Sequence, residues 1–142
     1  MSGRRTTIGR IVCALLLLAA TSSAIAGSGQ KNYRLYCMGC HRADGAGSPE
    51  NGIPSMRDEL GFFLRLPEGR AYLSQVPGTL NTPLSDAETA ELLNWVLINI
   101  GRSSTPPDFQ RYTADDVSAY RAAVPEDVPG KRVKLLEQLG KR

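Results

Sequence analysis

Cys37-Met38-Gly39-Cys40-His41 is the most specific stretch of this 142-residue sequence. Two cysteines three positions apart place both thiols on one side of a single helical turn, and the adjacent histidine projects from the same turn. Thiols and an imidazole in this arrangement can bond the two vinyl groups of haem and bind its iron from one face. The motif therefore predicts one covalently attached haem c, with Cys37 and Cys40 as thioether positions and His41 as the proximal axial ligand.

Two other uses of paired cysteines fit the sequence less well. A structural zinc site needs four ligands, but His41 is the only histidine, and the third cysteine, Cys13, lies in the N-terminal leader. A thioredoxin-like dithiol would follow a strand in a βαβ pattern, and no such pattern is found in the sequence.

The N-terminus has the pattern of a secretory signal peptide. Residues 1–10 contain three arginines and no acid, residues 11–20 are almost entirely apolar, and residues 21–26 are mostly small. We expect cleavage after Ala26, with an uncleaved anchor as the alternative. The apolar run is shorter than the roughly 20 residues of a membrane-spanning helix, so we expect a periplasmic protein with no stable membrane span.

The net charge of the precursor gives no reason to expect a nucleic-acid partner. The formal charge of +3 comes from 17 basic and 14 acidic residues, and losing the three leader arginines leaves 14 of each sign. The basic balance thus belongs to the leader and does not indicate binding to nucleic acid or to an anionic membrane surface.

The periodicity after the leader predicts an all-α protein with one small domain, because no stretch alternates with a period of two. We expect a haem domain over residues 27–103 and a helical C-terminal extension over residues 104–142. The expected helical segments are about 28–40, 57–65, a segment from Pro67 that ends near Val76-Pro77-Gly78, 86–100, 114–123 (interrupted beyond by Pro125 and Pro129) and 131–139.

The segment 86–100 is the clearest of these helices. Ser85 and Glu88 have the spacing of a capping box, and Gly101 would occupy the position just after the last helical residue. Thr113 and Asp116 have the same spacing before the next helix. We expect the helix 86–100 to cross the first helix, and we expect Trp95 to be a core residue and not a haem contact.

With this motif near the start of the mature chain and a late amphipathic helix, residues 30–101 resemble class I monohaem c-type cytochromes. The resemblance implies a helical fold wrapped around haem and single-electron transfer between proteins. A weaker likeness to exported bacterial cytochromes, some associated with periplasmic dehydrogenases for small alcohols or amines, implies such a dehydrogenase as donor and a terminal oxidase or cytochrome as acceptor. It is carried by Phe63-Leu64, Gly69 to Leu73, Val76-Pro77-Gly78, Leu84-Ser85-Asp86 and Asn94-Trp95.

The sequence differs from that family at the position that usually supplies the sixth iron ligand. Class I cytochromes usually supply a methionine from a loop before the last core helix, but residues 76–84 contain none. Met38 is held between the two cysteines and cannot reach the opposite haem face. By elimination Met56 is the candidate distal ligand, and the alternative is an ordinary packing methionine that leaves the iron five-coordinate or bound by another group.

The surroundings of the haem are less well specified. The second ring nitrogen of His41 needs an acceptor, and we expect a backbone carbonyl of residues 46–54, next to Pro49 or Pro54. Arg42, Arg57 and Arg70 are candidates for pairing with haem propionates, although such arginines are more often solvated surface charges.

The sequence therefore predicts an exported electron carrier and not an enzyme, since its only histidine is used by iron. One alternative is a haem protein with an open sixth site, either a gas-binding sensor or a peroxidase-like enzyme. Another is a fixed electron-transfer subunit of a dehydrogenase, in which the C-terminal extension is a docking arm or a wrap over the haem domain.

Overall fold

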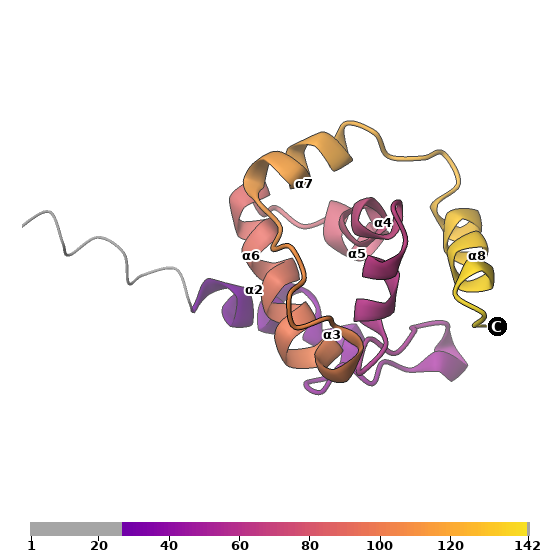
Figure 1. The fold of residues 1–142 in the computed structure, drawn as a ribbon. Helices are drawn as coiled ribbons and strands as arrows, with labels where there is room; N and C mark the ends of the chain where they lie inside the picture. The colour runs from indigo at the N-terminus through magenta and orange to yellow at the C-terminus, as the bar shows by residue number, and fades with distance from the viewer. Residues whose placement is uncertain (1–26, 142) are drawn as a thin grey trace, which may run out of the picture.

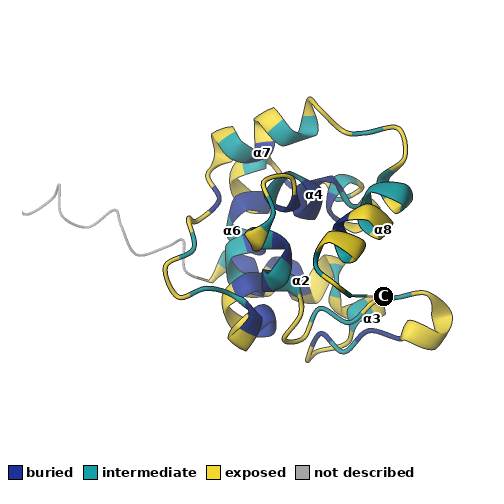
Figure 2. Ribbon diagram, turned by 45° about the vertical axis from the view of Figure 1, so that its right-hand side comes forward, coloured by how far each residue is buried: buried dark blue, intermediate teal, exposed yellow. Residues whose placement is uncertain are grey.

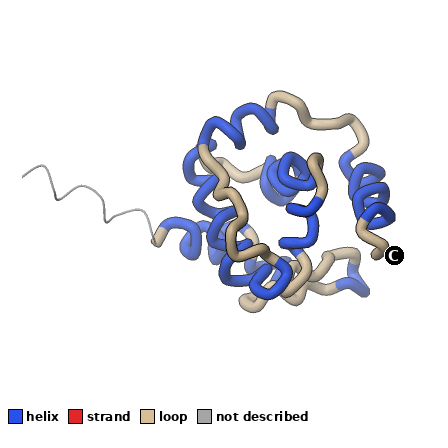
Figure 3. The backbone as a smooth tube through the Cα atoms, in the orientation of Figure 1, coloured by secondary structure: helices blue, strands red, loops and turns tan. Residues whose placement is uncertain are grey.

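The computed structural model describes residues 27–141, and within this range the chain is helical (Figures 1 and 3). The predicted signal peptide, residues 1–26, lies outside the described residues. An isolated antiparallel bridge between Ser48 and Ile53 is the only extended pairing in residues 27–141, which confirms the all-α prediction. The elements are α2 (Ser28–Tyr36), α3 (Met38–His41), η1 (Pro49–Asn51), η2 (Leu60–Arg65), α4 (Gly69–Gln75), α5 (Pro77–Leu80), α6 (Asp86–Val96), η3 (Leu97–Gly101), η4 (Arg102–Ser104), α7 (Ala114–Arg121) and α8 (Val128–Gln138).

No helix of residues 27–141 is both long enough and apolar enough to span a bilayer.

Helices α2 and α6 cross at close range, as predicted. A Cβ atom on Gly29 would lie 2.5 Å from the Trp95 Cβ and 2.7 Å from the Glu91 carbonyl oxygen, so only glycine allows this approach. The Tyr33 ring packs against Trp95 with a centroid distance of 5.3 Å. Trp95 is therefore a half-buried packing residue of this crossing, at the edge of the core and not fully inside it.

Both predicted capping boxes are formed. In α6 the Ser85 side chain accepts from the backbone N–H of Glu88 while the Glu88 carboxylate accepts from the Ser85 N–H. In α7 Thr113 and Asp116 exchange the same pair of hydrogen bonds. Each box satisfies two backbone donors that a helix start leaves unpaired.

The end of α6 differs from the prediction. The helix continues beyond Val96 as a π-helical turn, η3, and Gly101 is its last residue; the positive φ of 38° belongs to Arg102. Gly101 has another reason to be glycine, since a Cβ there would lie 2.7 Å from the Thr105 Oγ1. That hydroxyl donates to the Leu97 carbonyl at 2.8 Å, and this hydrogen bond closes the widened turn.

Four other helix boundaries also differ from the prediction. The first helix is divided at Cys37 into α2 and α3, and the segment predicted from Arg57 becomes a 3-10 helix that begins only at Leu60. Pro77 begins the short helix α5, although the prediction placed it at the end of a helix. Pro129 lies in the first turn of α8, although the prediction made it a break between helices. Proline is compatible with a first turn because its missing N–H would have no partner there.

The C-terminal extension wraps over the rest of the domain (Figure 1). Helix α7 packs against α6 and α4, and α8 packs against α4. Figure 2 shows buried residues concentrated on α2, α4 and α6, with exposed surface on the outside of α7 and α8. One hydrophobic core joins both parts of the chain: it contains Phe63, Tyr72, Leu73, Ala90, Leu93 and Leu97 together with Tyr112, Val117 and Leu135 from the extension.

Polar contacts fix the extension as well. The Asn94 side chain donates to the Tyr112 carbonyl at 2.9 Å and accepts from the Tyr112 N–H at 2.8 Å. Arg121 donates to the Asp86 carboxylate at 2.6 Å and to the Leu84 carbonyl at 3.2 Å. These contacts tie residues 112–121 to both ends of the segment that leads into and forms α6.

Candidate haem-binding site

The Cys37–His41 motif forms a single helical turn. The N–H groups of Cys40 and His41 donate to the Cys37 carbonyl at 3.2 Å and 2.9 Å. Neither thiol is in a disulfide; Cys37 is half-buried and Cys40 is exposed. Met38, between them, is 37% exposed. The turn therefore presents both thiols and the imidazole from one short segment, as the spacing predicted.

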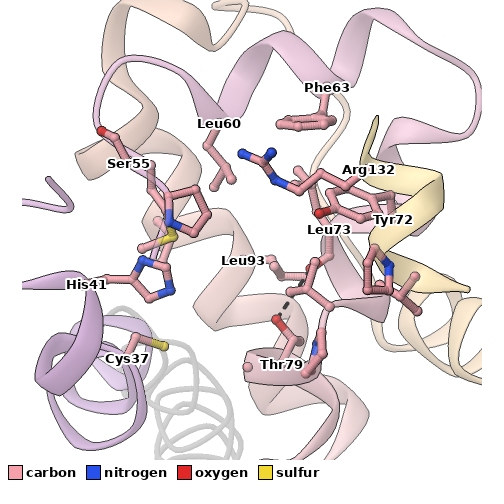
Figure 4. A pocket seen from close by; sticks show the side chains of 18 of the residues that line it. Cys37, His41, Ser55, Leu60, Phe63, Tyr72, Leu73, Thr79, Leu93 and Arg132 are labelled. Atoms are coloured by element: carbon pink, nitrogen blue, oxygen red, sulfur yellow. Dashed lines mark hydrogen bonds between the residues drawn. The ribbon is translucent and has the colours of Figure 1, made fainter. Parts of the chain in front are cut away.

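This turn opens onto a cavity of about 620 Å³. A volume of this size is in the range of sites for small molecules and cofactors. Cys37 and His41 lie along one side of it, and Leu60, Phe63, Tyr72 and Leu73 border the rest (Figure 4). Most of the lining is apolar, and it comes from five regions: the motif, the loop 49–56, the segment 60–79, helix α6 and the start of α8.

The imidazole of His41 is suited to bind a metal. Burial lowers the pKa of His41, with the Pro54 carbonyl acting in the opposite direction. A lowered pKa keeps the ring neutral near pH 7, which is the form that ligates iron. Its Nδ1 atom is buried and has no hydrogen-bond partner among residues 27–141.

The carbonyl of Pro54 is the best candidate for the expected hydrogen-bond acceptor of that nitrogen. It lies near enough to act on the pKa of His41, but the contact does not have the geometry of a formed hydrogen bond. Pro54 belongs to the loop in which we expected the acceptor. A hydrogen bond from His41 Nδ1 to this carbonyl would fix the orientation of the imidazole ring, as is usual for metal-bound histidines.

Met56 lines the same cavity as His41. Its backbone N–H donates to the Gly45 carbonyl at 2.8 Å, which positions the residue after the glycine-containing loop. The half-buried side chain packs against the cluster of Tyr33, Leu84, Leu92, Val96 and Ile100, against which Cys37 also packs. Met56 is thus brought to the site, on the part of the wall that it shares with Cys37.

The wall across from His41 carries polar groups that the sequence did not indicate. Figure 4 shows Tyr72 and Arg132 on the opposite side of the cavity from His41, with Thr79 at its lower edge. Burial raises the pKa of Tyr72, and the nearby Arg132 opposes that shift. The Thr79 hydroxyl is already used, since it donates to the Leu73 carbonyl at 3.3 Å. No motif marks Arg132, which enters the site only because α8 folds back on α4.

The three arginines proposed as propionate partners are placed elsewhere. Arg42 lies 3.9 Å from Glu50 and Arg57 lies 2.6 Å from Asp44. Arg70 lies 3.3 Å from Asp116 and stacks over the Tyr112 ring at 4.2 Å. None of the three lines the cavity, whose only arginine among residues 27–141 is Arg132.

No protein-family model, no curated protein and no solved structure matches this chain. The functional argument therefore depends on the site itself. Within residues 27–141 no group of three or more His, Cys, Asp or Glu side chains is arranged to hold a metal ion by itself. The cavity itself offers the Cys37 thiol, the His41 imidazole, the Met56 thioether and mostly apolar walls, while the Cys40 thiol is exposed on the same helical turn and is not among the lining residues. This set fits a flat apolar cofactor bonded at one edge.

Proposed function

We propose that this protein is an exported monohaem c-type cytochrome that carries single electrons between periplasmic redox proteins. The observation that carries the proposal is the opening of the Cys37–His41 turn onto an apolar cavity of about 620 Å³. A motif of this kind on a surface with no cavity would have no place for a porphyrin. Here the thiol of Cys37 and the His41 ring border that cavity together (Figure 4).

The chain's own residues have defined roles in this proposal. Cys37 and Cys40 would hold the cofactor by thioether bonds, and His41 would bind the iron through the ring nitrogen that faces the cavity. When bound, haem supplies a one-electron couple between ferric and ferrous iron. Leu73, Leu93 and the neighbouring apolar walls exclude water, which disfavours the more highly charged ferric state and so raises the potential.

Met56 is the proposed distal ligand. It is a cavity-lining methionine, and Met38, the only other methionine of residues 27–141, is exposed on the motif turn. A thioether ligand would raise the potential further and would leave no coordination position for an external molecule.

A second candidate function is a haem protein with an open sixth position. The observation in its favour is that Met56 packs against the same buried cluster as Cys37, while the wall across from His41 carries Tyr72, Thr79 and Arg132 (Figure 4). A hydroxyl and a guanidinium on that side could donate hydrogen bonds to a molecule bound at the iron. This arrangement would suit a gas-binding sensor or a peroxidase-like enzyme.

The proposed partners are a periplasmic dehydrogenase for small alcohols or amines as donor and a terminal oxidase or another cytochrome as acceptor. Leu35 and Tyr36, which directly precede the motif, are 61% and 42% exposed, and Met38 within the motif is 37% exposed. Exposed apolar side chains beside the thioether positions suit the brief, small contacts of redox partners. The core packing of α7 and α8 favours an extension that wraps the domain over one that is a separate docking arm.

Export of the full chain in a host that attaches haem c tests the proposal. We expect an N-terminus at Gly27 and haem that stays with the polypeptide on a denaturing gel, and we expect Cys37→Ala with Cys40→Ala to lose it. A wild-type chain without covalent haem refutes the proposal.

Spectra of the haem-loaded protein, with and without carbon monoxide, separate the two candidate functions. The electron carrier is supported by a low-spin spectrum that does not change when carbon monoxide is added. This spectrum should be lost in Met56→Ala and kept in the matched control Met38→Ala. A ferrous form that binds carbon monoxide at once, unchanged by Met56→Ala, supports the open site.

A further inference from the structure

Arg132 is a positive charge that points into an apolar cavity. It is half-buried, and within residues 27–141 its guanidinium forms no ion pair and no hydrogen bond. The other arginines with buried or half-buried positions are compensated: Arg70 pairs with Asp116 at 3.3 Å and Arg121 pairs with Asp86 at 2.6 Å. Its neighbour Lys131 lies 3.7 Å from Glu68.

The cavity offers Arg132 no negative charge. No aspartate or glutamate is among the cavity-lining residues, and the charge of Arg132 acts on the Tyr72 hydroxyl, whose pKa it lowers against the effect of burial. Withdrawing a guanidinium from water without a partner is unfavourable, and arginines in such positions are normally paired. A negatively charged group on a molecule that fills the cavity would supply this partner.

The position of the guanidinium matches one end of the proposed cofactor. Haem carries its two vinyl groups on one edge and its two propionates on the opposite edge. Figure 4 shows Cys37 below His41 on one side of the cavity, and the Arg132 side chain reaching in from the opposite side with its guanidinium near Leu60, away from Cys37. A thioether at Cys37 thus directs the carboxylate edge toward Arg132.

We propose that Arg132, brought in by the C-terminal helix α8, is the charge partner of a haem propionate. The inference rests on the proposed haem-binding function and goes beyond it by assigning the role of the extension. A guanidinium can donate two parallel hydrogen bonds to a carboxylate, which gives such a pair both strength and orientation. The extension is then a cover that sets the potential of the haem, and Arg132 is a positioning residue for its carboxylate.

Helix α8 is fixed well enough to hold this pair. Leu135, on the next turn, is 2% exposed and belongs to the main core. Lys131 contacts Gln75 at 3.4 Å as well as Glu68, and the Asp127 side chain caps the start of the helix by accepting from the Gly130 N–H at 2.8 Å. The arginine therefore projects from an anchored element and not from a free chain end.

The equilibrium redox potential of the haem-loaded full chain tests this inference. Arg132→Gln should shift the ferric-to-ferrous ratio at fixed ambient potential about tenfold toward ferric, or about 59 mV for one electron. The expected size is that of a unit charge acting over about 12 Å at an effective dielectric constant of about 20. Arg132→Lys, which keeps the charge, should restore most of the shift. The matched control is Lys134→Gln, which removes a charge from an exposed position of the same helix and should change the ratio little.

Three outcomes overturn the inference. An Arg132→Gln potential that differs from the wild type no more than that of Lys134→Gln shows that the guanidinium has no special place beside the haem. An unchanged potential with altered cyanide affinity of the ferric protein places the guanidinium beside the iron and not at a propionate. A wild-type chain without covalent haem overturns both this inference and the proposed function, whereas a haem-loaded variant with unchanged potential overturns this one alone.

Discussion

Replacing Leu135 with alanine tests whether the C-terminal helix is part of the folded core. Leu135 is 2% exposed and packs in the cluster that contains Tyr72 and Leu73. A buried Leu→Ala change costs about 2–5 kcal/mol, because apolar contact is lost and the cavity left behind collapses only in part. Alanine is at least as good a helix former as leucine, so the whole cost comes from packing. Against a typical domain stability of about 5–15 kcal/mol, this loss is large.

Urea unfolding followed by circular dichroism measures the effect. A loss of about 3 kcal/mol with an m-value of about 2 kcal/mol/M lowers the unfolding midpoint by about 1.5 M. The matched control is Val133→Ala on the same helix, at a position 55% exposed. It removes no buried contact and improves helix propensity, so its free energy of unfolding should stay within about 0.5 kcal/mol of that of the wild type.

Equal midpoints for the two variants would refute the reasoning. They would mean that α8 leaves α4 in solution and behaves as a docking arm. A lower m-value in Leu135→Ala, with a small change in midpoint, would instead show that the helix detaches before the remainder unfolds.

Three further predictions concern other parts of the fold. Gly29→Ala should lower the free energy of unfolding by about 1–3 kcal/mol or more, and with it the melting temperature, because the new Cβ would lie 2.5 Å from that of Trp95. The control Gly39→Ala should leave the melting temperature unchanged, since a Cβ at Gly39 would have nothing within 4 Å. Ser85→Ala should cost about 0.5–2 kcal/mol in urea unfolding, since it removes one half of the α6 capping box. Burial raises the pKa of Tyr112, whose hydroxyl donates to the Arg70 carbonyl at 2.8 Å. Its contribution to stability should therefore be complete below about pH 10 and decrease as the pH rises toward the raised pKa; Tyr112→Phe should remove this alkaline decrease, and an unchanged decrease would contradict the assignment.

The features that the sequence predicted correctly are those with local causes. A capping box needs residues only three positions apart, and both boxes formed as expected. The helical turn at Cys37–His41 is equally local. The crossing of the first and the late helix was expected from amphipathic patterns, although the closeness allowed by Gly29 could be seen only once both helices were in place.

The features that escaped prediction depend on tertiary contacts. Arg132 lies in an amphipathic stretch in which any basic residue could face solvent, and its place in the cavity follows from the packing of α8 on α4. The wall on which Met56 lies is set by its packing against α6, which no spacing in the sequence encodes. The π-helical end of α6 depends on the Thr105 hydroxyl that folds back onto the Leu97 carbonyl.

The sharing of one core between early and late segments also has a consequence for the order of assembly. Val117 and Leu135 complete a cluster that begins at Phe63, so the apolar centre cannot close until most of the polypeptide has been made. Contacts so distant along the chain form late in folding, since their loop-closure entropy must be overcome first. Until the last helix docks, the side of the cavity that Val128, Pro129 and Arg132 line therefore stays open.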